Sequence, residues 1–227
     1  MHDKPIILLF IKAPLKGQIK SRLAAAIGTG AALELYQCFV LDTIDIVGAL
    51  AVPSRICFYP PDAETTIRAW LGNKLDCIPQ QGNDLGERME SAFKQAFQEG
   101  YDRAVLIGSD IPALSARIID EAFTSLNVHD TVLGPAADGG YYLIGFTAKT
   151  FQPDLFHHIA WSTNTVLDET LARIRESGRR VRLLPKLHDV DTKDDLRIFF
   201  KSRRNDPVNS SRTLAYLREQ EGRFFRP

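Results

Sequence analysis

The chain has 227 residues, 44% of them hydrophobic and 25% charged, and its acidic and basic residues balance to a formal net charge of zero. These values are typical of one large globular domain and exclude a disordered or collagen-like chain. The longest apolar run, residues 5–11, is too short to cross a bilayer. Because Lys12 interrupts that run and no small-residue cleavage site follows, we expect neither a membrane span nor a signal peptide, and we expect a cytoplasmic protein.

The cysteines and the charge distribution add two weaker indications. Cys38, Cys57 and Cys77 are widely spaced in apolar stretches, which favours buried thiols of a reducing compartment over disulfides or metal ligands. From residue 170 onward, fifteen Lys and Arg stand against eight Asp and Glu. This excess is either a solvated basic face or a patch for an anionic partner. Without a helix-turn-helix or RNA-binding motif, we expect no nucleic-acid partner, and a homodimer is left open.

Apolar runs and apolar residues at steps of three or four alternate along the chain, which predicts strands and helices in turn. In chain order these are strand 6–11, helix 33–47, strand 55–59, helix 63–71, strand 75–79, helix 85–97, strand 104–107, helix 118–126, strands 131–133 and 141–146, helix 165–177, strand 181–184 and helix 194–200. The alternation predicts an α/β fold, a mostly parallel mixed sheet flanked by helices on both faces. The two strands without a helix between them predict an antiparallel excursion.

The domain organisation is expected to be simple. There is no internal repeat and no Ser- or Gly-rich linker before residue 205, so residues 1–204 are predicted to form one domain. The polar stretch 205–211 contains Pro207 and is expected to separate this domain from a C-terminal extension, 205–227, with a short helix at 213–220.

Ligands of open α/β sheets bind beyond the carboxyl ends of the strands, so the segments that follow the strands matter most. After the first strand comes K-A-P-L-K-G-Q-I-K-S-R-L, residues 12–23, with four cations: Lys12, Lys16, Lys20 and Arg22. Gly17 permits a tight loop and close approach to a ligand. Backbone N–H groups, a helix start and cations together form a phosphate cradle, although the spacing fits neither a Walker A nor a dinucleotide fingerprint. The alternative is an exposed basic turn.

A second segment, residues 80–89, follows the strand at 75–79. Asp84 is a candidate helix N-cap, with Glu87 placed as in a capping box. Capping alone could explain both residues. Gly82 and Gly86 are less easily explained by capping and suggest close approach of the backbone to a base or ribose. Gly82, Asp84 and Arg88 are the candidates for nucleotide contact.

Two carboxylates are candidates for a metal site. Asp110 follows the strand at 104–107, and Asp191 follows the last strand and precedes a helix. Mg²⁺ and Mn²⁺ take one or two protein carboxylates and let substrate phosphates supply the remaining ligands. The sequence therefore predicts that these aspartates share one such cation. Helix capping is the alternative for each, with Thr192 and Asp195 a plausible cap pair.

Two further segments are candidates for the acceptor side. Asp138 lies in an Asp-Gly-Gly segment between two strands, where it is either part of a plain hairpin turn or a residue that binds the transferred sugar or acts as a base toward the acceptor. Trp161, in the segment W-S-T, is either a core residue before a helix N-cap or part of an acceptor site.

Taken in order, six motifs resemble one family. They are K-A-P-x-x-G-x-x-K-[ST]-R-L, D-L-G-E-R-M, I-G-S-D-x-P, G-P-A-x-D-G-G-Y-Y-L-I-G, W-S-T and D-V-D-T-x-x-D-L, and the resemblance runs from about residue 6 to residue 196. The chain resembles the DUF2064 group, also called the rSAM/selenodomain-associated transferase 1 or glycosyltransferase-A-like family, which is related to 2-phospho-lactate guanylyltransferase and the molybdenum-cofactor nucleotidyltransferases. Departures are small: Ser21 where Thr is common, Lys16 as an extra cation and Ile111 where Cys often stands.

The resemblance implies a nucleotide-diphospho-sugar transferase (GT-A, Rossmann-like) fold. It also implies nucleotide binding by residues 12–22 and a divalent cation, Mg²⁺ or Mn²⁺, at Asp110, with Asp191 as second ligand by analogy with sugar nucleotidyltransferases. The expected ligands are a nucleotide-activated donor and a small-molecule acceptor. The expected catalytic residues are Asp110, Asp138 and Lys20.

The resemblance leaves the reaction open, because function depends on the site rather than the fold. Glycosyl transfer from a nucleoside-diphosphate sugar is favoured, since usage in the family leans that way and Asp138 is a candidate base for a hydroxyl acceptor. Nucleotidyl transfer with release of pyrophosphate is the first alternative. A non-catalytic nucleotide-binding module is the second.

Overall fold

A computed structural model describes residues 4–204 and 211–225 of the chain. Within them, strands form at β1 (Pro5–Lys12), β2 (Ser54–Tyr59), β3 (Cys77–Pro79), β4 (Arg103–Gly108), β5 (Thr131–Pro135), β6 (Tyr141–Thr147) and β7 (Val181–Leu183). Helices form at α1 (Ser21–Ile27), α2 (Thr29–Gly48), α3 (Glu64–Leu71), α4 (Leu85–Gln98), α5 (Ala116–Ser125), the 3₁₀-helix η1 (Pro153–Phe156), α6 (Val166–Glu176), α7 (Lys193–Arg203), α8 (Arg212–Glu219) and α9 (Glu221–Phe224). No helix among these residues is both long and apolar enough to cross a membrane.

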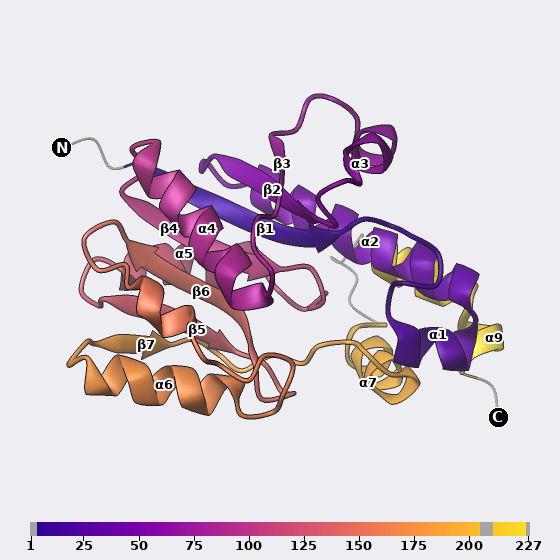
Figure 1. Cartoon of the computed structure of the whole chain (residues 1–227). Coiled ribbons are helices and arrows are strands. Elements are labelled where there is room, and N and C mark those ends of the chain that lie inside the picture. Colours follow the sequence, from indigo (N-terminus) through magenta and orange to yellow (C-terminus); the bar gives the residue numbers. More distant parts are fainter. Residues whose placement is uncertain (1–3, 205–210, 226–227) are drawn as a thin grey trace.

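The strands form one mixed sheet in the order β3-β2-β1-β4-β6-β5-β7 (Figure 1). β1 pairs in parallel with β2 and β4, whereas β6 runs antiparallel to both β4 and β5. The predicted α/β class and the antiparallel excursion are therefore confirmed. The excursion is short because five residues join β5 to β6, too few for a crossover helix.

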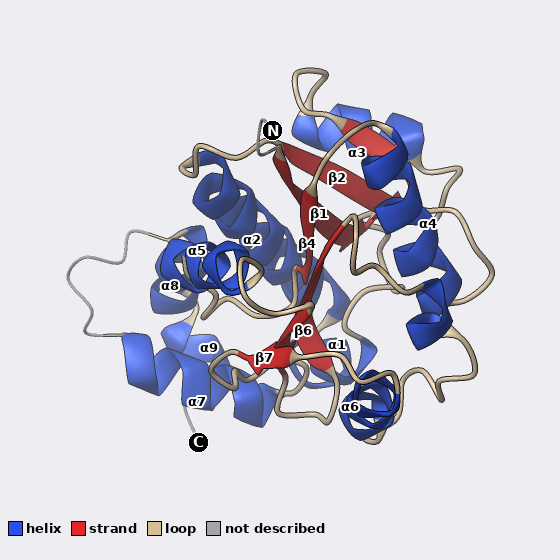
Figure 2. Ribbon diagram, turned by 90° about the vertical axis from the view of Figure 1, so that its left-hand side faces the viewer, coloured by secondary structure: helices blue, strands red, loops and turns tan. Residues whose placement is uncertain are grey.

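Helices cover both faces of the sheet, and Figure 2 shows the twisted sheet between α2 and α5 on one side and α4 and α6 on the other. One buried cluster joins one face of the strands to α2, α3 and α5, through residues such as Val40, Ile67 and Ile119. A second cluster joins the other face to α4, η1 and α6, with Phe93 and Phe146 in edge-to-face contact. Burial of alternate strand residues on both faces explains why β1 is a continuous apolar run in the sequence.

A third buried cluster lies beyond the carboxyl end of the sheet, where α1, α2, α7, α8 and α9 pack together. Asp42 of α2 is buried and accepts hydrogen bonds from the backbone N–H groups of Arg212 and Thr213, so it caps the start of α8 from a distance in sequence. The predicted C-terminal helix is thus present and is attached to α2. The expected linker, apart from Ser211, lies outside the described residues, and the division at residue 204 stays a prediction.

Some local features were not predicted. The helical stripe predicted from residue 33 is the later part of α2, which begins at Thr29, and Gly28, with φ of 93°, separates it from α1. The turn at Gly28 lets α1 fold back against α2 and places α1 beside α7 (Figure 1). The loop between β1 and α1 is thereby held between the sheet and the third cluster.

Candidate active site

The first component of the site is the loop from Lys12 to Lys20, which leaves β1 at the carboxyl edge of the sheet. Tyr36 of α2, only 2% exposed, fixes its first residue. The Tyr36 hydroxyl accepts a hydrogen bond from the Lys12 N–H at 2.7 Å and donates to the Lys12 carbonyl at 3.1 Å. Gly17 has φ of 83°, which favours glycine, and open space beside it. Lys16 is exposed.

The second component is an ion cluster around Lys20, which precedes α1 with a left-handed backbone (φ 49°). The Lys20 ammonium lies 2.9 Å from Asp110 Oδ1 and 2.7 Å from Asp191 Oδ1. The other oxygen of Asp191, Oδ2, accepts a hydrogen bond from the Arg22 guanidinium at 2.7 Å. The Lys20 side chain is 4% exposed, against 28% for Asp191 and 54% for Asp110. Lys20 therefore points into the acidic pair rather than into the open loop.

The charges of the cluster support one another. Burial acts to lower the pKa of Lys20, but the charges of Asp110 and Asp191 outweigh it and raise the pKa above its usual value. Burial acts to raise the pKa of Asp191, but Lys20 and Arg22 outweigh it and hold the pKa below its usual value. At neutral pH, Lys20 is therefore an ammonium and Asp191 a carboxylate.

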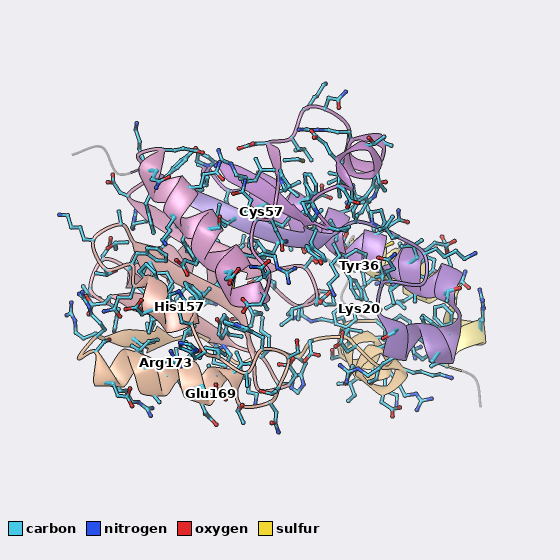
Figure 3. All side chains as sticks on the ribbon, in the orientation of Figure 1. Lys20, Tyr36, Cys57, His157, Glu169 and Arg173 are labelled. Atoms are coloured by element: carbon cyan, nitrogen blue, oxygen red, sulfur yellow. The ribbon has the colours of Figure 1, made fainter. Side chains whose placement is uncertain are left out.

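The cluster lines a cavity of about 210 Å³. Lys12, Gln18, Ile19, Lys20, Ser21, Arg22, Tyr36, Asp110 and Asp191 form its wall. Pockets that enclose whole drug-sized ligands measure roughly 300–1,000 Å³, so this volume suits phosphate groups better than an entire nucleotide. Figure 3 shows Lys20 and Tyr36 together beside α1, away from His157 and Arg173.

The donor set of this cavity fits a hard divalent cation. The Lys20 ammonium contacts one carboxylate oxygen of Asp110 and one of Asp191. These two oxygens are therefore near enough to each other for one Mg²⁺ or Mn²⁺ to bind both. Across residues 4–204 and 211–225 no group of three or more His, Cys, Asp or Glu side chains could hold a metal. A cation here would need substrate oxygens as further ligands, as is usual for Mg²⁺.

Neither aspartate of this pair caps a helix. α5 begins at Ala116 after Ser115, well beyond Asp110, so the capping alternative for Asp110 is wrong. Thr192 and Asp195 form a capping box at the start of α7, as predicted. Asp191 takes no part in this capping box, and its two carboxylate oxygens accept hydrogen bonds from Lys20 and Arg22. The backbone also links the two strand exits, because the Val190 N–H donates to the Asp110 carbonyl at 3.2 Å.

The segment predicted to contact base or ribose has structural contacts of its own. Asp84 is the N-cap of α4 and accepts a hydrogen bond from the Glu87 N–H at 2.8 Å. Gly82 has φ of 138°, and a Cβ there would lie 2.7 Å from the Arg88 backbone nitrogen. The turn itself therefore requires glycine. Arg88 lies over the ring of Tyr59, 4.2 Å from its centre. Nucleotide contact by Gly82, Asp84 and Arg88 stays a prediction.

Asp138 lies in the turn between β5 and β6. Its Oδ1 accepts a hydrogen bond from the Gly140 N–H at 2.9 Å, and the Ala136 N–H donates to the Gly140 carbonyl at 3.0 Å. These contacts are those of the hairpin turn that the sequence offered as an alternative. Burial, and after it the negative charge of Asp138, raise the pKa of the half-buried Asp189 above its usual value.

Trp161 is partly buried and packs against the second cluster, beside Tyr141 and against Gly86 of α4. A Cβ at Gly86 would lie 2.6 Å from the Trp161 indole nitrogen. Only glycine at this position therefore leaves room for the Trp161 ring, which explains why the D-L-G-E-R-M and W-S-T segments pack together. This supports a core role for Trp161. The helix cap expected just after it is wrong, because α6 begins at Val166.

Tyr36 was not singled out from the sequence, although it lies within the helix predicted at residues 33–47. A tyrosine among Leu and Val at a fully buried position is the one signal that could have marked it, because a buried hydroxyl needs a partner.

Comparison with known proteins supports the same family and fold. A sequence profile described as "Uncharacterized protein conserved in bacteria (DUF2064)" matches residues 43–163, more than half of the chain. A solved structure of a candidate nucleotide-diphospho-sugar transferase from Desulfovibrio desulfuricans G20 superposes with a TM-score of 0.93 at 40% identity, covering 97% of this chain and 96% of that one. A cytidylyltransferase from Leptospira borgpetersenii serovar Hardjo-bovis (strain JB197) shares the fold, with a TM-score of 0.58 at 14% identity over 97% of this chain and 95% of that one.

One curated relative carries a named activity. It is a 3-phospho-D-glycerate guanylyltransferase from Phenylobacterium zucineum (strain HLK1), 31% identical over 134 residues. The match covers 57% of this chain and 61% of the relative, so this chain spans less than two thirds of that protein. The structural neighbours give the chain a nucleotide-diphospho-sugar transferase fold. The profile matches more than half of the chain, and the Desulfovibrio protein is similar along nearly the whole of it. The chain therefore belongs to the DUF2064 family.

Proposed function

We propose that the protein is a nucleotidyltransferase, which transfers a nucleoside monophosphate from a nucleoside triphosphate to a phosphate-bearing small molecule. The observation that carries this proposal is the convergence of Lys12, Lys20 and Arg22 with Asp110 and Asp191 around one cavity at the carboxyl edge of the sheet. Cations that surround a small cavity suit a phosphate chain, and the acidic pair suits the divalent cation that accompanies one.

The number of cations favours a triphosphate donor. A triphosphate chain carries more negative charge than the diphosphate of a sugar nucleotide, and pyrophosphate takes more charge with it when it leaves. Lys12, Lys20 and Arg22 line the cavity, and Lys16 lies exposed on the same loop. The named activity of the Phenylobacterium relative is also a nucleotidyl transfer.

In the proposed reaction, an acceptor phosphate oxygen forms a bond to the α-phosphorus, and the bond from that phosphorus to the β-phosphate bridging oxygen breaks. The electron pair leaves with pyrophosphate. Lys20 and Arg22 would bind phosphate oxygens and stabilise the charge that develops on them. Asp110 and Asp191 would hold a divalent cation, which supplies further charge stabilisation to the phosphates. Tyr36 would keep Lys12 and the loop in position.

Glycosyl transfer remains the competing reaction. Asp138 is the residue that favours glycosyl transfer, because it could act as a base toward a hydroxyl acceptor. Its Oδ1 instead accepts a hydrogen bond within the β5–β6 turn, which weakens the case for that role. An acceptor phosphate is already an anion and needs no base, so nucleotidyl transfer does not depend on Asp138. The acidic pair and the cationic loop would serve either reaction.

The test supplies the full-length chain with Mg²⁺ or Mn²⁺ and each common nucleoside triphosphate or sugar nucleotide. Acceptors would include 3-phospho-D-glycerate, other phosphate monoesters and simple sugars. We expect acceptor-dependent release of pyrophosphate from a triphosphate and no reaction of sugar nucleotides. Release of a nucleoside diphosphate from a sugar nucleotide, with no pyrophosphate from any triphosphate, would refute the proposal in favour of glycosyl transfer.

A further inference from the structure

The Lys20 side chain has an unusual position for a phosphate-binding lysine. It is 4% exposed and contacts two carboxylates from different strand exits, at 2.9 Å and 2.7 Å. Its backbone is left-handed, with φ of 49° and ψ of 52°, which is uncommon for any residue other than glycine. Such a conformation persists only where its surroundings hold it in place, and a buried double ion pair does so.

The same two carboxylates line the cavity and are the acidic donors that a divalent cation there would use. A Mg²⁺ ion lies about 2.0–2.1 Å from its carboxylate oxygens, closer to them than the 2.7 Å and 2.9 Å at which the Lys20 nitrogen already lies. An ammonium and a metal ion therefore cannot occupy the space between Asp110 and Asp191 together.

We propose that Lys20 and the divalent cation compete for Asp110 and Asp191, and that Lys20 is the resident counterion until metal and nucleotide arrive together. This rests on the proposed use of a metal–nucleotide donor. Once displaced, the buried ammonium needs another anion, because a buried charge without a partner is strongly unfavourable. The phosphates of the nucleotide supply that anion. Metal alone then binds weakly, and nucleotide strengthens metal binding by giving Lys20 its new partner.

Arg22 provides the matched control. It also contacts Asp191, through Oδ2, but its side chain is 68% exposed and it lies outside the space between the two aspartates. Removing either cation lowers the local positive charge by one unit. Only removal of Lys20 vacates the place that the metal would take.

The experiment measures the affinity for Mn²⁺ in the absence of nucleotide. Electron paramagnetic resonance gives the concentration of free Mn²⁺ during a titration. The full-length wild type is compared with Lys20→Met, Lys20→Gln, Arg22→Met and the double variant Lys20→Met/Asp110→Asn. We expect both Lys20 variants to bind Mn²⁺ at least about tenfold more tightly than wild type, and Arg22→Met to gain less than about threefold, since a tenfold change corresponds to about 1.4 kcal/mol. The double variant should lose the gain.

A second readout is the midpoint of thermal unfolding. Without metal, Lys20→Met should unfold below the wild type, because two carboxylates then face each other without a cation, and Mn²⁺ should raise its midpoint more than that of the wild type. The glutamine variant keeps a polar amide, so it serves if the methionine variant fails to fold.

Equal or weaker Mn²⁺ binding by both Lys20 variants would overturn the competition, as would an equal gain in Arg22→Met. None of these measurements requires turnover. A failure of nucleotidyl transfer would appear only in the product assay, with the Mn²⁺ affinities unchanged, so the two proposals can fail separately.

Discussion

Two cations in this protein each lie between two carboxylates, at opposite ends of the same sheet. At the amino edge, Arg55 of β2 contacts Asp76, which precedes β3, and Glu99, which follows α4, at 2.7 Å and 2.8 Å. At the carboxyl edge, Lys20 contacts Asp110 and Asp191 at similar distances. Both cations are largely buried, with 11% of the Arg55 side chain and 4% of the Lys20 side chain exposed.

The difference between the clusters lies in the cation and in its surroundings. The planar guanidinium of Arg55 forms several directed hydrogen bonds and connects two elements of the scaffold. Lys20 is a compact charge on a flexible stem, and it lines a cavity together with Lys12 and Arg22. We therefore expect the first cluster to contribute to stability and the second to binding and chemistry. Ion pairing alone does not distinguish them.

The largest expected effect comes from the carboxyl edge. Asp110→Asn removes a charge and almost no volume, and Lys20 keeps Asp191 as a partner, so the chain should still fold, with a somewhat lower unfolding midpoint. If Asp110 orients metal and phosphates as proposed, loss of its charge should lower kcat by at least about 100-fold, the usual cost of removing one transition-state electrostatic contact. Steady-state kinetics with saturating metal checks this. An unchanged kcat would exclude Asp110 from the reaction.

At the amino edge the expectation is reversed. Arg55→Met should lower the free energy of unfolding by about 1.5–3 kcal/mol, the range for hydrogen bonds to charged groups, because Asp76 and Glu99 lose their shared partner. Urea unfolding measures this loss. Turnover at a temperature where the variant is folded should stay within about threefold of wild type. A kinetic loss as large as that of Asp110→Asn would contradict the division between the two clusters.

Asp138 tests where the functional region ends. Asn at this position retains an oxygen that can accept the Gly140 N–H, so the β5–β6 turn should survive. If the reaction needs no base, Asp138→Asn should lower kcat by less than about tenfold and leave nucleotide affinity unchanged, since general-base catalysis contributes roughly 100-fold or more. A loss in that higher range would restore Asp138 as a base and favour glycosyl transfer.

The smallest effect concerns pH. Hydrogen bonds from Arg55 hold the pKa of Glu99 below its usual value. A carboxylate whose pKa is lower in the folded state adds stability above its unfolded pKa, and this stability is lost as the pH falls. Between about pH 7 and about pH 4, wild type should therefore lose more stability than Glu99→Gln, by less than about 1 kcal/mol. Urea unfolding at the two pH values measures this, and identical losses would show that Glu99 contributes nothing.

Much of the fold was predictable because the strands are buried on both faces and the helices carry clear apolar stripes. The strand at 104–107 and the helix at 85–97 differ from β4 and α4 by one residue or less at each end. The break between α1 and α2 at Gly28 was harder to predict, because both segments are helical and only the positive φ of Gly28 separates them. η1 and α9 have four residues each, too few to show a period.

The site was predictable where it depended on topology and not where it depended on side-chain contacts. Parallel strands end at one edge of a sheet, so Lys20, Asp110 and Asp191 could be predicted at that edge because each follows a strand. Their direct contact could not be predicted from topology, because β6 and β5 lie between β4 and β7. The sequence did not indicate that Lys20 would point at the carboxylates, since a lysine in a phosphate loop is expected to face the ligand. Gly82 similarly suggested an approaching ligand, whereas the close neighbour is the Arg88 backbone.

The most direct test of the account is pyrophosphate release from a nucleoside triphosphate by wild type, Lys20→Met and Arg55→Met, with Mg²⁺ and an acceptor phosphate under one set of conditions. The account predicts that wild type and Arg55→Met release pyrophosphate at rates within about threefold of each other, and that Lys20→Met is slower by at least about 100-fold. Equal rates in wild type and Lys20→Met, or an equal loss in both variants, would contradict the claim that the carboxyl-edge cluster is the catalytic site.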